Sequence, residues 1–231
     1  MLSHALIDPG VALLRLERPD KRNALSIELR AAIAEALGSI ARDEAVRATV
    51  VVGEGSAFCA GMDTGQFGGD DSNRRALYES SVAFGRALAD HPKPLVTAVN
   101  GPALGGGFVL ALLCDLRIAG RSATFGFPEL RRGIPASLGA ARAALAPAVA
   151  ADLSLTGRLV GADEALALGV VSAVVDDDVL LDAARERAAQ IAALPPSGPQ
   201  TVKEWAREGG DWRELLAREE RAFRDALGLP E

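Results

Sequence analysis

The sequence predicts an α/β fold in which short β-rich turns stack and helices lie outside them. Three successive segments each show an apolar strand, a small-residue turn and a helix, without a sharp sequence repeat. Recurring units of this kind favour a layered core in which apolar helix faces pack on strands. With 231 residues, of which 49% are hydrophobic, the chain can bury a substantial core.

The first unit begins near the N-terminus. Residues 11–16 are mostly valine and leucine and predict a strand, and the polar segment RPDKRNALS at residues 18–26 predicts a turn. The Ser26 hydroxyl can cap a helix, and residues 27–40 are amphipathic, so a helix is expected there.

The second unit repeats this order. It predicts a strand at residues 48–52, a turn that runs to Asp63, a loop rich in glycine and aspartate at residues 65–73, and a helix at residues 75–89.

The third unit has the same plan. It predicts a strand at residues 95–99, a glycine-rich turn at residues 101–107 and a helix at residues 108–113. Short strands are expected at residues 116–119 and 124–125.

The rest of the chain is rich in alanine and predicts helices. Breaks are expected at Gly157, at Gly169 and at the PPSGP segment of residues 195–199. The last break divides the chain into a core, residues 1–195, and a helical C-terminal arm, residues 196–231. The arm is amphipathic, so we expect it to cover its own core or a neighbouring subunit.

Composition narrows the functional classes. The 25 Lys and Arg are outnumbered by 31 Asp and Glu, the net charge is −6, and no basic stripe is present, so nucleic acid is not an expected partner. No signal peptide or membrane span is evident, and we expect a cytoplasmic protein. Cys59 and Cys114 lack metal-ligand spacing and predict buried free thiols, with no disulfide and no metal site.

Two small-residue turns are the strongest functional signal. TVVVGEGSAFCAGMD at residues 49–63 and VNGPALGGG at residues 99–107 are apolar runs that end in uncovered backbone amides. Amides about 3 Å from a developing oxyanion lower a barrier by roughly 3 to 4 kcal/mol each. The pair therefore predicts an oxyanion hole.

The triple glycine of residues 105–107 has competing interpretations. At the start of a helix it would add a partial positive charge to a bound oxyanion. A phosphate loop is not supported, because no GK[ST] follows and no GxGxxG with a distant acid is present. Close helix packing without chemistry is the remaining alternative.

Proton transfer is expected to depend on a carboxylate. Neither His4 nor His91 is placed as a base, which makes a serine triad improbable. Glu129, in FGFPELRRGIP, follows a proline among apolar neighbours that can raise its pKa, although an acid after proline is also common in a helix first turn. Asp63 and Asp115 end apolar segments and are expected to accept backbone hydrogen bonds at turns.

From residue 11 to residue 175, these segments resemble the crotonase superfamily, also called the enoyl-CoA hydratase/isomerase family. RPDKRNALS resembles the family's entry segment for adenine and pantetheine, SAFCAGMD its first oxyanion turn and NGPALGGG its second. FGFPELRRGIP resembles its glutamate segment, and SLTGRLVGADEALALGVVSAVV the helix pair and strand that follow. The resemblance implies a crotonase-like ββα spiral core.

The resemblance also implies residue roles. The amides of Met62 and Gly106 would hold a thioester oxygen, Glu129 would move protons, and Arg22, with Lys21, would meet coenzyme A phosphates. The positions expected to bind substrate are Arg22, Ala24, Leu25, Ala60, Gly61, Asp63, Leu104, Gly105, Val109 and Pro128. No cofactor is implied, because coenzyme A is part of the substrate, and the expected assembly is a homotrimer or a dimer of trimers.

Three departures from the family pattern affect the expected reaction. Family hydratases carry a second glutamate where this chain has Val109, and a lysine often found after the first oxyanion turn is replaced by Gly65. The C-terminal arm is also shorter than usual. One carboxylate suits an isomerase, which moves a proton from the α to the γ carbon, better than a hydratase. Two alternatives to an isomerase are a hydratase and a catalytically idle acyl-CoA-binding protein. A third is a protein in which the glycine turns serve packing alone.

Overall fold

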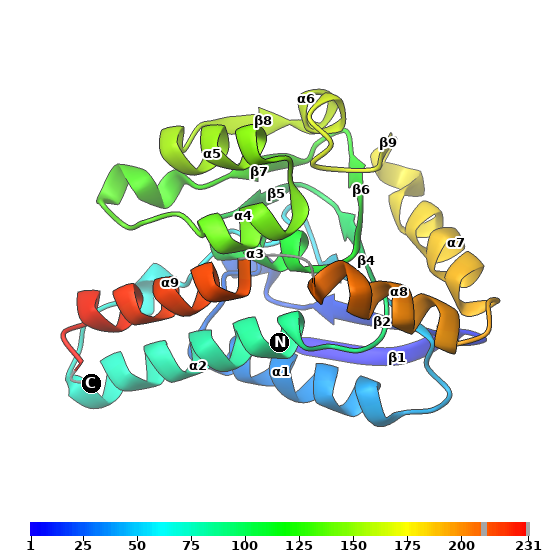
Figure 1. Ribbon diagram of the computed structural model, residues 1–231, viewed down its shortest axis with the longest axis horizontal. Helices are drawn as coiled ribbons and strands as arrows, with labels where there is room; N and C mark the ends of the chain where they lie inside the picture. The colour runs from blue at the N-terminus through cyan, green and yellow to red at the C-terminus, as the bar shows by residue number, and fades with distance from the viewer. Residues whose placement is uncertain (209–211, 230–231) are drawn as a thin grey trace.

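The computed structural model describes residues 1–208 and 212–229, whose strands form two sheets (Figure 1). One sheet has the order β1-β2-β3-β4-β6-β9, and the other has the order β5-β7-β8. All neighbouring strands run parallel except the pairs β1/β2 and β7/β8. The strands are β1 (Leu2–Asp8), β2 (Val11–Leu16), β3 (Ala48–Gly53), β4 (Leu95–Val99), β5 (Pro102–Leu104), β6 (Leu116–Gly120), β7 (Thr124–Gly126), β8 (Leu159–Gly161) and β9 (Ala173–Val175).

Helices pack around these sheets, with α1 and α2 side by side and α9 lying between α2 and α4 (Figure 1). Among the described helices, none is long and apolar enough to cross a membrane. The α-helices are α1 (Ile27–Arg42), α2 (Asp71–Ala89), α3 (Gly106–Leu113), α4 (Leu138–Ala144), α5 (Pro147–Thr156), α6 (Ala162–Ala167), α7 (Leu180–Ala192), α8 (Ser197–Glu208) and α9 (Trp212–Ala226). The 3₁₀ turns are η1 (Pro19–Lys21), η2 (Thr64–Gln66), η3 (Pro128–Arg132) and η4 (Asp177–Val179).

The central strands β3 and β4 of the large sheet are buried on both faces. Val50 and Val52 of β3 join the apolar cluster that includes α7, whereas Val51 joins the main core with α1 and α3. Because successive strand side chains point to opposite faces, a continuous apolar strand is what a sheet covered on both sides requires. The expected layered fold is confirmed.

The element boundaries differ in places from the sequence prediction. The second helix starts at Asp71, four residues early, because the Asp70 side chain caps it by accepting the Asn73 N–H at 2.9 Å. Strand β1 was not indicated by the sequence. It forms an edge hairpin with β2, its residues are partly exposed, and Gly10 turns the chain with φ +80°.

Short strands appear in two regions where the sequence predicted a turn or helices. The third turn, expected to be continuous, contains β5, which pairs with β7, and the helix after it begins at Gly106 rather than at Phe108. The C-terminal half is not purely helical: β8 pairs with β7, and β9, the strand that the resemblance of SLTGRLVGADEALALGVVSAVV implied, pairs with β6. Strand β5 lies inside a glycine-rich turn and β8 has only three residues, so neither shows an apolar run that the sequence could reveal.

The C-terminal arm packs on its own chain. Helix α9 contacts α4 closely enough that a Cβ built on Gly139 would lie 2.8 Å from the Leu216 backbone nitrogen. The Glu219 carboxylate accepts the Ser137 hydroxyl at 2.7 Å and the Gly139 N–H at 2.6 Å. The division into a core and an arm remains a prediction, and α9 of this arm packs on α4 of its own core.

Candidate active site

The first predicted oxyanion turn is held beside the entry segment by a short backbone ladder. The Leu25 N–H donates to the Gly61 carbonyl at 2.8 Å, and the Asp63 N–H donates to the Leu25 carbonyl at 3.1 Å. This parallel pairing leaves the Met62 N–H directed away from Leu25. Within residues 1–208 and 212–229, that N–H makes no hydrogen bond.

The second predicted oxyanion turn approaches the first. Gly105 adopts φ +52° and its N–H donates to the Gly126 carbonyl at 2.9 Å, which sets Gly106 as the first residue of α3. A Cβ built on Gly106 would lie 3.8 Å from the Met62 nitrogen. The two amides are thus close together, at a helix start that carries partial positive charge.

The glycines of the triple glycine serve different purposes. A Cβ on Gly107 would lie 2.1 Å from the Cys59 carbonyl oxygen, so this glycine permits close packing of the two turns. A Cβ on Gly105 would lie 3.0 Å from Glu129 Oε2, so its absence leaves room for that carboxyl group. Gly107 therefore supports the interpretation as close packing, and Gly105 supports the interpretation as part of a catalytic site.

Glu129 lies against the second turn, in η3, with Pro128 at the first position. Burial raises the pKa of Glu129 to about 7. Its Oε2 is buried and accepts no hydrogen bond from the described part of the chain. Phe127, before Pro128, is fully buried and packs against Phe108 with tilted rings whose centroids are 5.0 Å apart, in keeping with the expected apolar surroundings.

Val109 lies one helical turn after Gly105, whose carbonyl accepts the Val109 N–H at 2.9 Å. Its side chain is partly buried and packs against the main core. This position, where the resemblance led us to expect a second glutamate in a hydratase, is thus apolar here, one helical turn from the Gly105 that Glu129 approaches.

Comparison with known proteins identifies the family. The sequence model of the enoyl-CoA hydratase/isomerase family matches residues 7–222. The chain belongs to this family.

Its relatives include proteins named as hydratases and one named as an isomerase of an epoxide. A putative enoyl-CoA hydratase of Thermus thermophilus is 35% identical, covering 88% of this chain and 92% of that protein. The 1,2-epoxyphenylacetyl-CoA isomerase of Escherichia coli is also 35% identical, covering 88% and 80%. Among solved structures, an enoyl-CoA hydratase/isomerase from Xanthobacter autotrophicus aligns with a TM-score of 0.87 and 31% identity, covering 98% and 86%. The crotonase fold is therefore confirmed.

The other expected substrate positions border the two turns of this family member. Ala24, Ala60 and Leu104 are partly exposed, whereas Leu25 is buried. The Ala60 N–H donates to the Arg22 carbonyl at 2.9 Å, which places the entry segment beside the first turn.

Arg22 and Lys21 are exposed at the end of η1, where Arg22 has φ 50°. Gly61 has φ +95°, and a Cβ there would lie 2.8 Å from the Leu104 carbonyl oxygen. Asp63 accepts the Gly65 N–H at 3.1 Å, and Asp115 accepts the Leu95 N–H at 2.7 Å, as expected for acids at turns.

Three polar residues that the sequence prediction did not single out hold the first turn and the segments beside it. Asn23 is fully buried and donates to the Ala57 carbonyl at 2.8 Å. Gln66 accepts the Ile27 N–H at 2.7 Å, and Arg18 pairs with Asp63 at 3.0 Å. Asn23 has a left-handed backbone with φ 55°, which asparagine adopts more readily than most residues. An asparagine in a predicted turn was therefore the one sequence feature that could have indicated its structural role.

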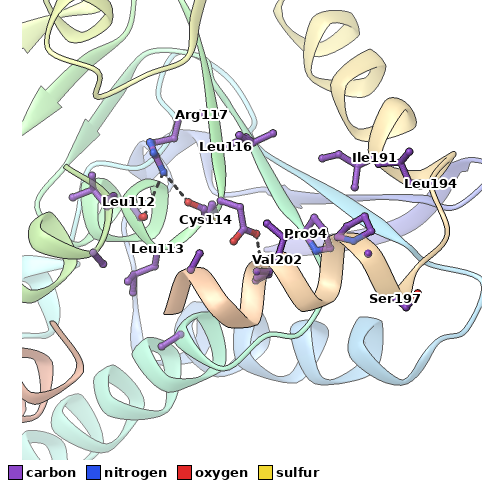
Figure 2. A pocket seen from close by; sticks show the side chains of 18 of the residues that line it. Pro94, Leu112, Leu113, Cys114, Leu116, Arg117, Ile191, Leu194, Ser197 and Val202 are labelled. Carbon is purple, nitrogen blue, oxygen red and sulfur yellow. Dashed lines mark hydrogen bonds and ion pairs between the residues drawn. The ribbon is translucent and has the colours of Figure 1, made fainter. Parts of the chain in front are cut away.

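A cavity of about 770 Å³ lies away from these residues, between α8 and the C-terminal end of α3. Figure 2 shows apolar side chains around it, including Leu113, Ile191 and Val202. Lys203 crosses from α8 to meet Asp115 at 2.7 Å. Because neither Glu129 nor either oxyanion turn lines this cavity, we do not assign it to the reaction.

Proposed function

We propose that the protein acts on an acyl-CoA thioester through an enolate, with the amides of Met62 and Gly106 binding the enolate oxygen and Glu129 moving the proton. The observation that carries the proposal is the convergence of both turns with a carboxyl group whose pKa is raised to about 7. Donors fixed before the reaction stabilise developing charge without reorganisation.

Isomerase-type transfer is the favoured reaction. Glu129, when ionised, would remove a proton from the α carbon of a 3-enoyl thioester, and the electron pair would delocalise onto the thioester oxygen as a dienolate. The protonated Glu129 would then return the proton to the γ carbon, giving the 2-enoyl thioester. One group with a pKa near the working pH can perform both steps.

Hydration is the second candidate, and the name of the Thermus thermophilus relative favours it. It requires one group to activate water and another to deliver a proton, and Val109 leaves the usual second position without a carboxylate. An idle acyl-CoA-binding protein is the third candidate, favoured by Val109 and disfavoured by the buried Glu129 beside two intact turns.

Substrate contacts follow from the same arrangement. Ala24, Leu25, Ala60 and Leu104 would line the acyl-CoA channel beside the two turns. Arg22, an exposed cation on an acidic protein, would meet coenzyme A phosphates together with Lys21. Gly61, Gly105 and Pro128 would shape the backbone around the thioester.

We also propose assembly as a homotrimer or a dimer of trimers. Large exposed apolar side chains support it, because such groups often mark contact surfaces. They include Leu155, 81% exposed, and Trp205, 65% exposed. Light scattering at micromolar concentration tests this assembly, and a monomer would contradict it.

Products identify the reaction most directly. Mass spectrometry and chromatography of a panel of 2-enoyl and 3-enoyl thioesters should show conversion of 3-enoyl to 2-enoyl substrates faster than addition of water. Dominant formation of 3-hydroxyacyl products would favour the hydratase, and no turnover with retained thioester binding would favour the idle binder.

A further inference from the structure

The segment that carries Met62 is fastened by an arginine to which the reaction scheme gives no role. Arg18 precedes η1, and its side chain and that of Asp63 are each only 18% exposed. One terminal guanidinium nitrogen donates to the Ala24 carbonyl, and the other lies 3.0 Å from Asp63 Oδ2. One side chain thus joins the residue before Leu25 to the residue after Met62.

The Asp63 carboxylate is held on both sides. While Oδ2 meets Arg18, Oδ1 accepts the Gly65 N–H at 3.1 Å and caps η2. The residue that follows Met62 therefore has its side chain fixed by two partners, and its own N–H is fixed by Leu25.

The backbone ladder alone is a small restraint. It consists of an isolated bridge between Leu25 and Met62, outside any named strand, and of the Ala60 N–H bond to the Arg22 carbonyl on the N-terminal side of that bridge. Charge-assisted hydrogen bonds from the planar guanidinium group are stronger and more directional than neutral ones. Arg18 supplies these at both edges of the ladder, so it restricts how the Met62 peptide can rotate.

We propose that Arg18 and Asp63 are positioning residues that keep the Met62 amide in the orientation required to bind the thioester oxygen. This inference rests on the proposed function, in which that amide is an oxyanion donor. Asp63, expected from the sequence to contact substrate, acts through Met62 instead. Small displacements of a preorganised donor reduce turnover more than they reduce substrate binding.

The test compares Arg18→Gln and Asp63→Asn with wild type. Asp63→Asn keeps the acceptor for Gly65 and weakens only the ion pair, so it serves where Arg18→Gln fails to fold. Arg185→Gln is the matched control, because Arg185 on α7 pairs with Asp8 at 3.2 Å, outside the two oxyanion turns.

Two readouts separate positioning from general stabilisation. The first is kcat and KM for a 3-enoyl-CoA, and the second is the infrared carbonyl stretch of bound butyryl-CoA labelled with ¹³C at the thioester carbon. In both site variants kcat should fall about 10- to 100-fold, with KM within about threefold of wild type. The carbonyl stretch, lowered by wild type, should return toward its value in water, while the control matches wild type.

Different results would contradict the positioning role of Arg18 and Asp63 and the proposed function on which it rests. Folded variants with wild-type kcat and an unchanged carbonyl stretch would overturn the positioning role while leaving the oxyanion hole intact. A wild-type protein that neither turns over 3-enoyl-CoA nor lowers the carbonyl stretch would contradict the proposed function itself, and the positioning role with it.

Discussion

Glu129 has a carboxyl oxygen that is buried without a partner among the described residues, against Gly105 in the second oxyanion turn. A carboxylate in this setting lacks most of its hydration, and burial raises the pKa of Glu129 to about 7. The group is thus suited to both accept and return a proton near neutral pH.

The raised pKa of Glu129 predicts a pH-dependent effect on stability. A carboxyl group whose pKa is raised by folding favours the folded state fully below its unfolded pKa, near 4.5, and this contribution is lost as pH rises through about 7. Glu129→Gln should therefore match wild type at pH 4 and exceed its unfolding free energy at pH 8 by about 1 to 3 kcal/mol. Urea unfolding at both pH values measures this, and an equal difference at the two would contradict it.

Val109 tests the assignment of the reaction. Because it lies one turn from Gly105 on α3, Val109→Glu would place a second carboxylate near Glu129. Hydration of a 2-enoyl-CoA should rise, and stability should fall by about 1 to 3 kcal/mol because a polar group replaces an apolar one in a partly buried site. Val109→Gln is the control, since glutamine is similar in size to glutamate and is not a base. Equal hydration by both variants would show that a carboxylate at position 109 does not set the reaction.

At the level of elements, the start of α3 is expected to bind the oxyanion through its backbone. Proline is tolerated at a first helical position but has no N–H, so Gly106→Pro removes the donor while the helix can remain. Turnover should fall at least about 10²-fold, whereas Gly106→Ala, which keeps the N–H, should lose less. Circular dichroism establishes folding, and wild-type turnover in a folded Gly106→Pro variant would refute the assignment.

The docking of α9 on α4 depends on a close approach at Gly139. Gly139→Ala places a Cβ 2.8 Å from the Leu216 nitrogen, so we expect a loss of about 1 to 3 kcal/mol and faster proteolysis of the arm. Gly198→Ala, in α8, meets no atom within 4 Å and is the control. Limited proteolysis followed by mass spectrometry compares them, and equal cleavage rates would show that this contact does not hold the arm.

For the whole molecule, the sequence indicates the order of the elements better than their ends. Long apolar strands such as β3 are recognisable because both faces of the sheet are covered, and Ser26 caps α1 as expected, accepting the Leu29 N–H at 3.2 Å. The three-residue strands β5 and β8 are too short to show a pattern, whereas β7 was expected at residues 124–125 and β9 was implied by the family resemblance.

The candidate site was accessible from sequence only in part. Glu129 and the glycine turns are local motifs, whereas the pair of Arg18 and Asp63 spans 45 positions and depends on how the turns stack. Long-range pairs of this kind follow from the fold, and no spacing in the sequence indicates them. The same applies to the contact between Glu219 and Ser137, 82 positions apart.

The central claim is that the whole molecule catalyses its reaction with one glutamate, Glu129, and two backbone amides, those of Met62 and Gly106. The most direct measurement compares wild type with Glu129→Gln for conversion of a 3-enoyl-CoA and for binding of a saturated acyl-CoA. The account predicts that turnover falls by about 10² to 10⁴ while thioester affinity stays within a few fold, because the variant keeps shape and loses the base. Unchanged turnover in a folded Glu129→Gln protein would contradict it.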